Sequence, residues 1–166
     1  MRDVAATPAP RAMSIVSVDH PSFGGEIDRF LATLRSEPRY FGPSARANPK
    51  PFPSLIEALR GRGGFRIAAV EDGRIVGMAR VDGAGELFLA VVAERRGTGI
   101  GASLGRASLE RAAGLHYRRV VMRSTQRSRA ALRVAERLGC LVVDHVHGRT
   151  DLILSPLGVT HLARSA

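Results

Sequence analysis

The sequence predicts an α/β (α+β) fold, with a mixed, mostly antiparallel sheet of six to seven strands flanked by about four helices. Three observations support this prediction. Two apolar runs joined by Asp72-Gly73 indicate an antiparallel hairpin, and a third run follows closely. The segment 87–123 alternates strand, helix and strand, which is typical of a crossover between parallel strands. A last pair of apolar runs, within 141–154, indicates a second hairpin.

Length and composition are those of a single globular domain. The chain has 166 residues, of which 45% are hydrophobic and 24% charged. We expect a disordered leader at 1–13, one domain at 14–158 and a C-terminal tail at 159–166. No segment has the apolar character of a signal peptide or a membrane span, and the single Cys140 excludes an internal disulfide. These features predict a cytoplasmic protein without a membrane partner, either a monomer or a homodimer.

Arginine carries almost all the positive charge. The net charge is +10, and Lys50 is the only lysine. Two origins fit this balance: the compositional bias of a GC-rich genome, or a polyanionic partner such as nucleic acid or a phosphate-rich cofactor. With two tyrosines and no tryptophan, the chain offers few side chains on which bases can stack. Nucleic acid is therefore the less favoured partner.

The first third of the chain alternates between short regular segments and a long irregular one. A β-like run at 15–18 precedes a helix at 23–35. Five prolines exclude a regular element at 36–53 and indicate a long loop, followed by a short helix at 54–60. The apolar residues of the first helix recur at helical spacing and predict its core face: Ile27, Phe30, Leu31 and Leu34.

The rest of the chain is a series of strands with two helices. One helix is predicted at 99–113, with Gly114 as its C-cap. The other is predicted at 128–138, with Ser128 as its N-cap and Gly139 as its end. The predicted strands are 65–71, 74–81, 86–92, 119–123, 141–146 and 150–154.

A glycine-rich segment connects the strand at 86–92 to the helix that follows it. Glycine lets the backbone approach a ligand, and the first N–H groups of a helix have no helical partner and attract anions. Arg96 adds a positive charge. The segment therefore predicts a phosphate-binding cradle, formed by Arg96, Gly97, Thr98, Gly99, Ile100, Gly101 and Ala102.

Two other interpretations of these glycines are less favoured. Gly97-x-Gly99-x-x-Ala102 fits the loose pattern of dinucleotide-binding folds, but the strand at 119–123 lacks the acidic residue that holds a ribose. The antiparallel strands upstream also fit that fold poorly. A purely structural turn is the second alternative, and three glycines beside two arginines argue against it.

The segment Arg96-x-x-Gly99-x-Gly101 matches the Q/R-x-x-G-x-G/A motif of the GNAT acyltransferases, and the element order from 15 to 154 is similar to their fold. This resemblance implies a GNAT acyl-CoA N-acyltransferase fold. It also implies acetyl-CoA as co-substrate, a primary amine on a protein lysine or a small molecule as acceptor, and no metal. The pyrophosphate would lie on the cradle, and the pantetheine arm along the backbone of Leu89 and Val91.

Two further details narrow the resemblance. Many GNAT enzymes carry N-x-x-A-x-x-x-Y-x-x-x-G-F, whose tyrosine reprotonates the leaving thiolate, but here Ser128 and Ala135 stand at the asparagine and tyrosine positions. Bacterial Pat-type protein lysine acetyltransferases share this absence and carry a glutamate early in the strand before the pyrophosphate loop, where this chain has Glu86. The segment 39–43 also resembles their R-F-F-x-P segment.

The resemblance implies that Glu86 is the general base and that Ser128 contributes to the cofactor site. Side chains alternate along a strand, so Glu86 shares a face with Phe88 and Ala90. Three alternatives stay open. Glu86 is an exposed residue that merely begins a strand; the chain is a degenerate GNAT domain that binds a CoA thioester as a regulatory module; or it is an arginine-rich nucleic-acid-binding protein.

Overall fold

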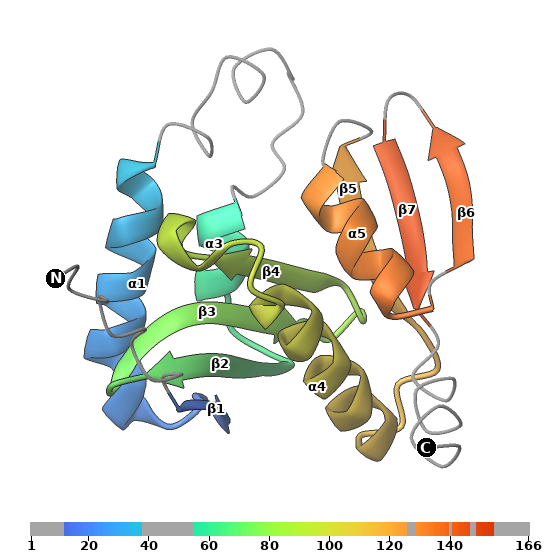
Figure 1. Ribbon diagram of the computed structural model, residues 1–166. Helices are drawn as coiled ribbons and strands as arrows, with labels where there is room; N and C mark the ends of the chain where they lie inside the picture. Colours follow the sequence, from blue (N-terminus) through green and yellow to red (C-terminus); the bar gives the residue numbers. More distant parts are fainter. Residues whose placement is uncertain (1–11, 38–54, 126–128, 140, 147–148, 155–166) are drawn as a thin grey trace, which may run out of the picture.

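The computed structural model describes residues 12–37, 55–125, 129–139, 141–146 and 149–154. Figure 1 shows how the elements in these ranges are arranged. No helix among them is long and apolar enough to cross a membrane. The helices are α1 (Gly24–Ser36), α3 (Leu55–Arg60), α4 (Ile100–Gly114) and α5 (Arg129–Arg137), with 3-10 turns η1 (Pro21–Phe23) and η3 (Ala93–Arg95). The strands are β1 (Met13–Ser17), β2 (Phe65–Glu71), β3 (Arg74–Val81), β4 (Leu87–Val91), β5 (Val120–Thr125), β6 (Leu141–Val146) and β7 (Arg149–Leu154).

The first sheet is antiparallel, with the strand order β1-β2-β3-β4. The hairpin between β2 and β3 turns at Asp72 and Gly73, whose φ values are 50° and 75°. Two consecutive positive φ values produce a turn that matches the right-handed twist of the paired strands. The hairpin predicted from these two residues is therefore confirmed.

Different helices cover the two faces of this sheet (Figure 1). The helices α1 and α3 pack with one apolar cluster, and α4 and α5 pack with the other. Because side chains alternate along a strand, β4 contributes Phe88 and Ala90 to the α1 side, and Leu87, Leu89 and Val91 to the α4 side. The four α1 residues predicted to face the core are all buried. Each contributes about 1.5–3 kcal/mol to stability.

A second sheet contains three antiparallel strands in the order β5-β7-β6. One isolated parallel bridge, between Glu86 and Val121, connects it to the first sheet. Figure 1 shows β4 and β5 running apart from one another. The described residues thus contain seven strands divided between two sheets, and the predicted single mixed sheet of six to seven strands is not confirmed.

The ends of the two long C-terminal helices differ in how well the sequence predicts them. Gly114 lies inside the last turn of α4, and Leu115 is its C-cap. The prediction that Gly114 caps this helix is therefore wrong, because the left-handed residue is His116, with a φ of 61°. Gly139, with a φ of 66°, follows α5 as predicted. Most of the predicted leader, most of the loop at 36–53 and the whole tail at 159–166 lie outside the described residues.

Arg80 is a buried cation in β3 that holds the end of α3. Its side chain is 7% exposed. Nη1 donates to the carbonyl of Ala58 at 2.8 Å, and Nη2 donates to the carbonyls of Arg62 at 2.7 Å and Gly63 at 3.2 Å. The guanidinium also lies 6.0 Å from the centroid of the Phe88 ring. These groups replace the water that a buried charge loses, and they tie the α3–β2 connection to the sheet.

We expect Arg80→Ala to destabilise the protein by about 3 kcal/mol, because it leaves a cavity and removes the guanidinium that donates to three carbonyls. Arg74→Ala is the matched control on the same strand, since Arg74 is exposed, and its effect should stay within about 0.5 kcal/mol. Urea unfolding of the two variants measures both values. Equal stability of the two variants would contradict the structural role of Arg80.

Candidate active site

The glycine segment forms the turn between η3 and α4. Gly97 and Gly99 have φ values of 79° and 92°, in the left-handed region that glycine enters without steric cost. Gly99 is the N-cap of α4, where no side chain caps the helix and no acidic residue occupies the first turn. The hydroxyl of Thr98 donates to the carbonyl of Arg95 at 2.7 Å and closes the turn. The first hydrogen bond of the helix runs from the N–H of Ser103 to the carbonyl of Gly99 at 3.0 Å. The N–H groups of the first turn, which come before Ser103, therefore have no partner within the helix.

Gly101 differs from the other two glycines because its lack of a side chain serves helix packing rather than a left-handed backbone. A methyl group built on it would lie 3.3 Å from Cγ2 of Val134 in α5 and 3.5 Å from Leu89 in β4. One turn later, a methyl group on Gly105 would lie 2.6 Å from Cδ1 of Leu138. The two glycines therefore let α4 and α5 pack closely. Among the remaining predicted cradle residues, Ile100 is buried and Ala102 is half-buried.

Arg96 is held by contacts within the protein. Its Nε donates to the carbonyl of Val91 at 3.0 Å, and its Nη2 forms an ion pair with Glu37. The other carboxylate oxygen of Glu37 accepts the N–H of Ala93 at 3.2 Å. Glu37 is the C-cap residue of α1, so these contacts tie the end of α1 to the connection between β4 and α4. Glu37 is not predicted from the sequence, because 59 residues separate it from Arg96 and no local pattern links them.

One edge of β4 faces the space where the two sheets diverge. Hydrogen bonds alternate in an antiparallel pair, so every second residue turns its N–H and C=O away from the partner strand. The N–H of Val92 donates to the carbonyl of Val76 at 3.0 Å, which places the even-numbered residues of this segment toward β3. Leu89 and Val91 therefore turn their backbone groups toward β5, beyond the bridge. Of these groups, the carbonyl of Val91 accepts from Arg96.

Glu86 lies where the two sheets meet, directly before β4. Its N–H donates to the carboxylate of Asp82 at 2.9 Å, and its carbonyl accepts the N–H of Asp82 at 3.1 Å. The same carboxylate accepts the N–H of Ala84 at 2.9 Å. Together with the bridge to Val121, these bonds fix the backbone of Glu86, and its side chain is half-buried. Asp82 is not among the residues predicted from the sequence, although Asp before Gly83 is a typical signal for such a turn.

Some of the residues on which the predicted proton donor and the Pat-type resemblance depend lie outside the described residues. Ser128 and the segment 39–43 are not among the described residues, so their roles stay predictions. Ala135 is described, and it is 2% exposed in the apolar cluster on the α4 side of the sheet. The position of the usual tyrosine is thus filled by a small core residue.

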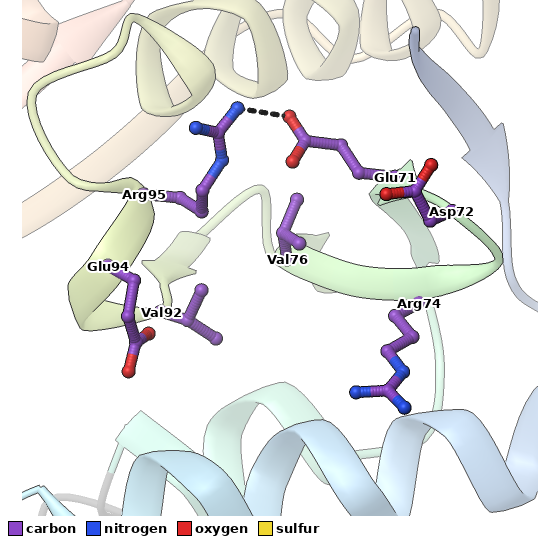
Figure 2. A pocket seen from close by; sticks show the side chains of 7 residues that line it. All are labelled: Glu71, Asp72, Arg74, Val76, Val92, Glu94 and Arg95. Carbon is purple, nitrogen blue, oxygen red and sulfur yellow. Dashed lines mark hydrogen bonds and ion pairs between the residues drawn. The ribbon is translucent and has the colours of Figure 1, made fainter. Parts of the chain in front are cut away.

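A hollow of about 480 Å³ lies beside η3 (Figure 2). In it, Nη2 of Arg95 lies 2.5 Å from the carboxylate of Glu71, which is 4% exposed. This hydrogen bond raises the pKa of Arg95 above its ordinary value. None of the predicted site residues lines the hollow, and the ion pair instead fixes the turn that precedes the glycines. The lining residues are Glu71, Asp72, Arg74, Val76, Val92, Glu94 and Arg95.

Gly85 allows the backbones of the two sheets to approach closely beside Glu86, and its substitution tests that role. Its φ is 83°, and a methyl group on it would lie 2.7 Å from the carbonyl oxygen of Arg119. Two backbones would have to separate to accommodate it, so we expect Gly85→Ala to destabilise the protein by about 2 kcal/mol or more. Gly83→Ala is the control, because a methyl group added there would have no atom within 4 Å. Urea unfolding should show a change for Gly85→Ala alone.

Solved structures resemble this arrangement. The structure of yncA from Salmonella typhimurium, described as an acetyltransferase and solved with its cofactor acetyl-CoA, gives a TM-score of 0.62 at 18% identity, covering 87% of this chain and 94% of that chain. A spermidine N-acetyltransferase chimera from Vibrio cholerae and hSSAT gives 0.62 at 13% identity, covering 89% and 98%. The ribosomal-protein-S5-alanine acetyltransferase from Vibrio fischeri gives 0.64 at 12% identity, covering 87% and 93%. These likenesses establish the fold.

Sequence comparison assigns the family. No curated protein gives a significant match to the chain. The family model of the acetyltransferase (GNAT) family matches residues 29–140, which is more than half of the chain and includes both Glu86 and the glycine segment. The chain therefore belongs to the acetyltransferase (GNAT) family.

Proposed function

We propose that this chain transfers an acetyl group from acetyl-CoA to a primary amine, with Glu86 as the general base. One observation carries the proposal. Glu86 directly precedes β4, and the outward-facing backbone of Leu89 and Val91 leads from there toward the glycine turn at the start of α4. A strand edge, an anion-binding helix end and a carboxylate thus lie along one continuous segment of 16 residues, 86–101.

The chemistry of this segment suits the three parts of a CoA thioester. The N–H groups at the start of α4 suit the pyrophosphate, because the helix end is positive and carries neither an acidic residue in its first turn nor a side-chain cap. The backbone groups of Leu89 and the N–H of Val91 suit the amides of the pantetheine arm, while the carbonyl of Val91 is held by Arg96. An N–H of this edge that donates to the thioester carbonyl would stabilise the negative charge that develops there.

Glu86 suits the role of general base by its position. A primary amine has a pKa near ~10.4 in water and is mostly protonated at neutral pH, so an acceptor must lose a proton before it attacks. The backbone of Glu86 is fixed by Asp82 and by the bridge to Val121, so its side chain leaves the main chain directly before β4. Bond formation between the amine nitrogen and the acetyl carbon then expels the thiolate of CoA.

The leaving thiolate requires no side-chain acid at residue 135. Thiolates of this kind are good leaving groups, and Ala135 carries no proton to donate. We propose that water or Ser128 supplies the proton. The Pat-type resemblance, based on Glu86, Ala135 and the segment 39–43, favours a protein lysine over a small amine.

The acceptor is the least constrained part of the proposal. Two solved structures with this fold are named for different acceptors, spermidine and the alanine of ribosomal protein S5. The fold alone is therefore compatible with small and with protein amines. The net charge of +10 opposes binding of strongly basic peptides and favours neutral or acidic acceptors.

Ligand binding tests the cofactor, and turnover tests the enzyme. Because acetyl-CoA would bind the folded state, a concentration near 100 times its Kd should stabilise the protein by about 2.7 kcal/mol and raise its Tm. Thermal unfolding measures this shift, and an amine screen with detection of free thiol measures turnover. An unchanged Tm would refute the cofactor assignment. Binding without turnover on any amine would support the regulatory alternative.

Glu86→Gln tests the general base. We expect kcat to fall by about 100-fold or more, because the amide cannot accept the amine proton, while the Kd for acetyl-CoA changes little. Glu94→Gln in η3 is the control, since Glu94 is exposed and lies in the connection that follows β4. Its kcat should match that of the unsubstituted protein. Full activity in Glu86→Gln would remove the base assignment and leave the cofactor assignment intact.

A further inference from the structure

Asp82, directly after β3, forms the last pair of the β3–β4 ladder with Glu86. In an antiparallel ladder, the residues of every second pair exchange two backbone hydrogen bonds. Between β3 and β4 these pairs join even-numbered residues, as the bond from the N–H of Val92 to the carbonyl of Val76 shows. The same register pairs Asp82 with Glu86, one step beyond the two strands. A regular ladder would therefore join these two residues by two backbone bonds.

A side chain carries one of the two bonds. The N–H of Asp82 donates to the carbonyl of Glu86 at 3.1 Å, as in a regular ladder. The carbonyl of Asp82 does not accept the return bond, because it accepts the N–H of Gly85 at 3.0 Å and closes the turn. The N–H of Glu86 donates instead to Oδ1 of the Asp82 carboxylate at 2.9 Å. The carboxylate thus takes the place of a backbone carbonyl.

The carboxylate of Asp82 serves as an acceptor of backbone N–H groups. Its Oδ1 also accepts the N–H of Ala84 at 2.9 Å, so one oxygen holds two residues of the turn. Among the residues that the structure describes, Asp82 forms no ion pair with an arginine. The position of the acceptor oxygen, rather than a counter-ion role, therefore explains why an aspartate suits this place.

This bond fixes Glu86 on the side of β3, while β5 fixes it on the other side. The carbonyl of Gly85 accepts the N–H of Val121 at 2.8 Å, and Glu86 forms the parallel bridge with Val121. Without Oδ1 of Asp82, the N–H of Glu86 would lose its acceptor, since the turn already occupies the Asp82 carbonyl. The peptide before Glu86 could then rotate and change the direction in which the Glu86 side chain leaves the main chain.

We propose that Asp82 is a positioning residue for acetyl transfer, and that its carboxylate sets the direction of the general base Glu86. The proposal rests on the proposed function. A general base must lie within hydrogen-bond reach of the proton that it accepts, and a misplacement of about 1 Å can cost about 100-fold in rate. Asp82 acts through Glu86, so its substitution changes the chemical step and leaves acetyl-CoA binding unchanged.

Steady-state kinetics with acetyl-CoA, and with the amine that reacts fastest in the free-thiol screen, tests the proposal. We expect Asp82→Ala to lower kcat about tenfold, while the Kd for acetyl-CoA changes less than about twofold. Asp82→Asn should keep kcat within about threefold of the unsubstituted protein, because its amide oxygen can accept the same N–H groups. If Asp82→Ala does not fold, Asp82→Glu replaces it. That variant keeps the charge but displaces the oxygen by one methylene, so its kcat should also fall.

Asp19→Ala is the matched control. Oδ1 of Asp19 also accepts a backbone N–H, that of Arg66 in β2, at 2.9 Å. The sheet order separates β2 from β4 by β3, so this bond does not hold Glu86. Urea unfolding measures how far each variant is destabilised, and kcat should fall for Asp82→Ala alone.

A double-mutant cycle shows whether Asp82 acts through Glu86. In the Glu86→Gln background, Asp82→Ala should lower the remaining kcat less than about twofold, because the base that it positions is already absent. Three results would overturn the proposal: unchanged kcat in Asp82→Ala, equal losses in Asp82→Ala and Asp82→Asn, or a tenfold loss that persists in the Glu86→Gln background. Full activity in Glu86→Gln, or no turnover by the unsubstituted protein, would instead refute the proposed function on which this inference rests.

Discussion

The single parallel bridge between Glu86 and Val121 is the constraint on which the arrangement of the candidate site depends. It connects the two sheets through the N–H of Val121, which donates to the carbonyl of Gly85 at 2.8 Å, and Asp82 holds the turn before Glu86. The pairing between the two sheets is also limited to this one bridge, so Leu89 and Val91, further along β4, turn their backbone groups outward without a partner strand. A longer parallel ladder would have closed this edge with β5.

The turn that follows β4 is anchored in two directions at once. Arg95 pairs with Glu71 at the end of β2, and Arg96 pairs with Glu37 at the end of α1. Adjacent arginines repel one another, and here each has its own carboxylate on a different side. The glycine turn thus begins from a position fixed by both the sheet and the first helix, which limits the freedom that three glycines would otherwise allow.

The sequence predicts the local elements and the glycine turn well, because their signals are local. Asp72-Gly73 determines a hairpin, and Gly97 and Gly99 have the left-handed conformation that the motif requires. The sequence does not predict contacts between distant segments. Glu37 lies 59 residues from Arg96, and only the packing of α1 brings the two together. The division into two sheets is likewise a matter of strand pairing, which alternation of apolar residues does not encode.

The burial of Ala135 bears on how this chain relates to enzymes of its family that use a tyrosine at the corresponding place. Ala135 is 2% exposed and belongs to a cluster that includes Leu104, Leu109 and Leu138. A phenol ring introduced there would have to displace its neighbours, at a cost of about 1–3 kcal/mol. The site with Ala135 and a site with tyrosine at residue 135 therefore differ by more than this one substitution. A tyrosine introduced at residue 135 of this chain needs compensating changes in the surrounding apolar cluster before it can serve as an acid.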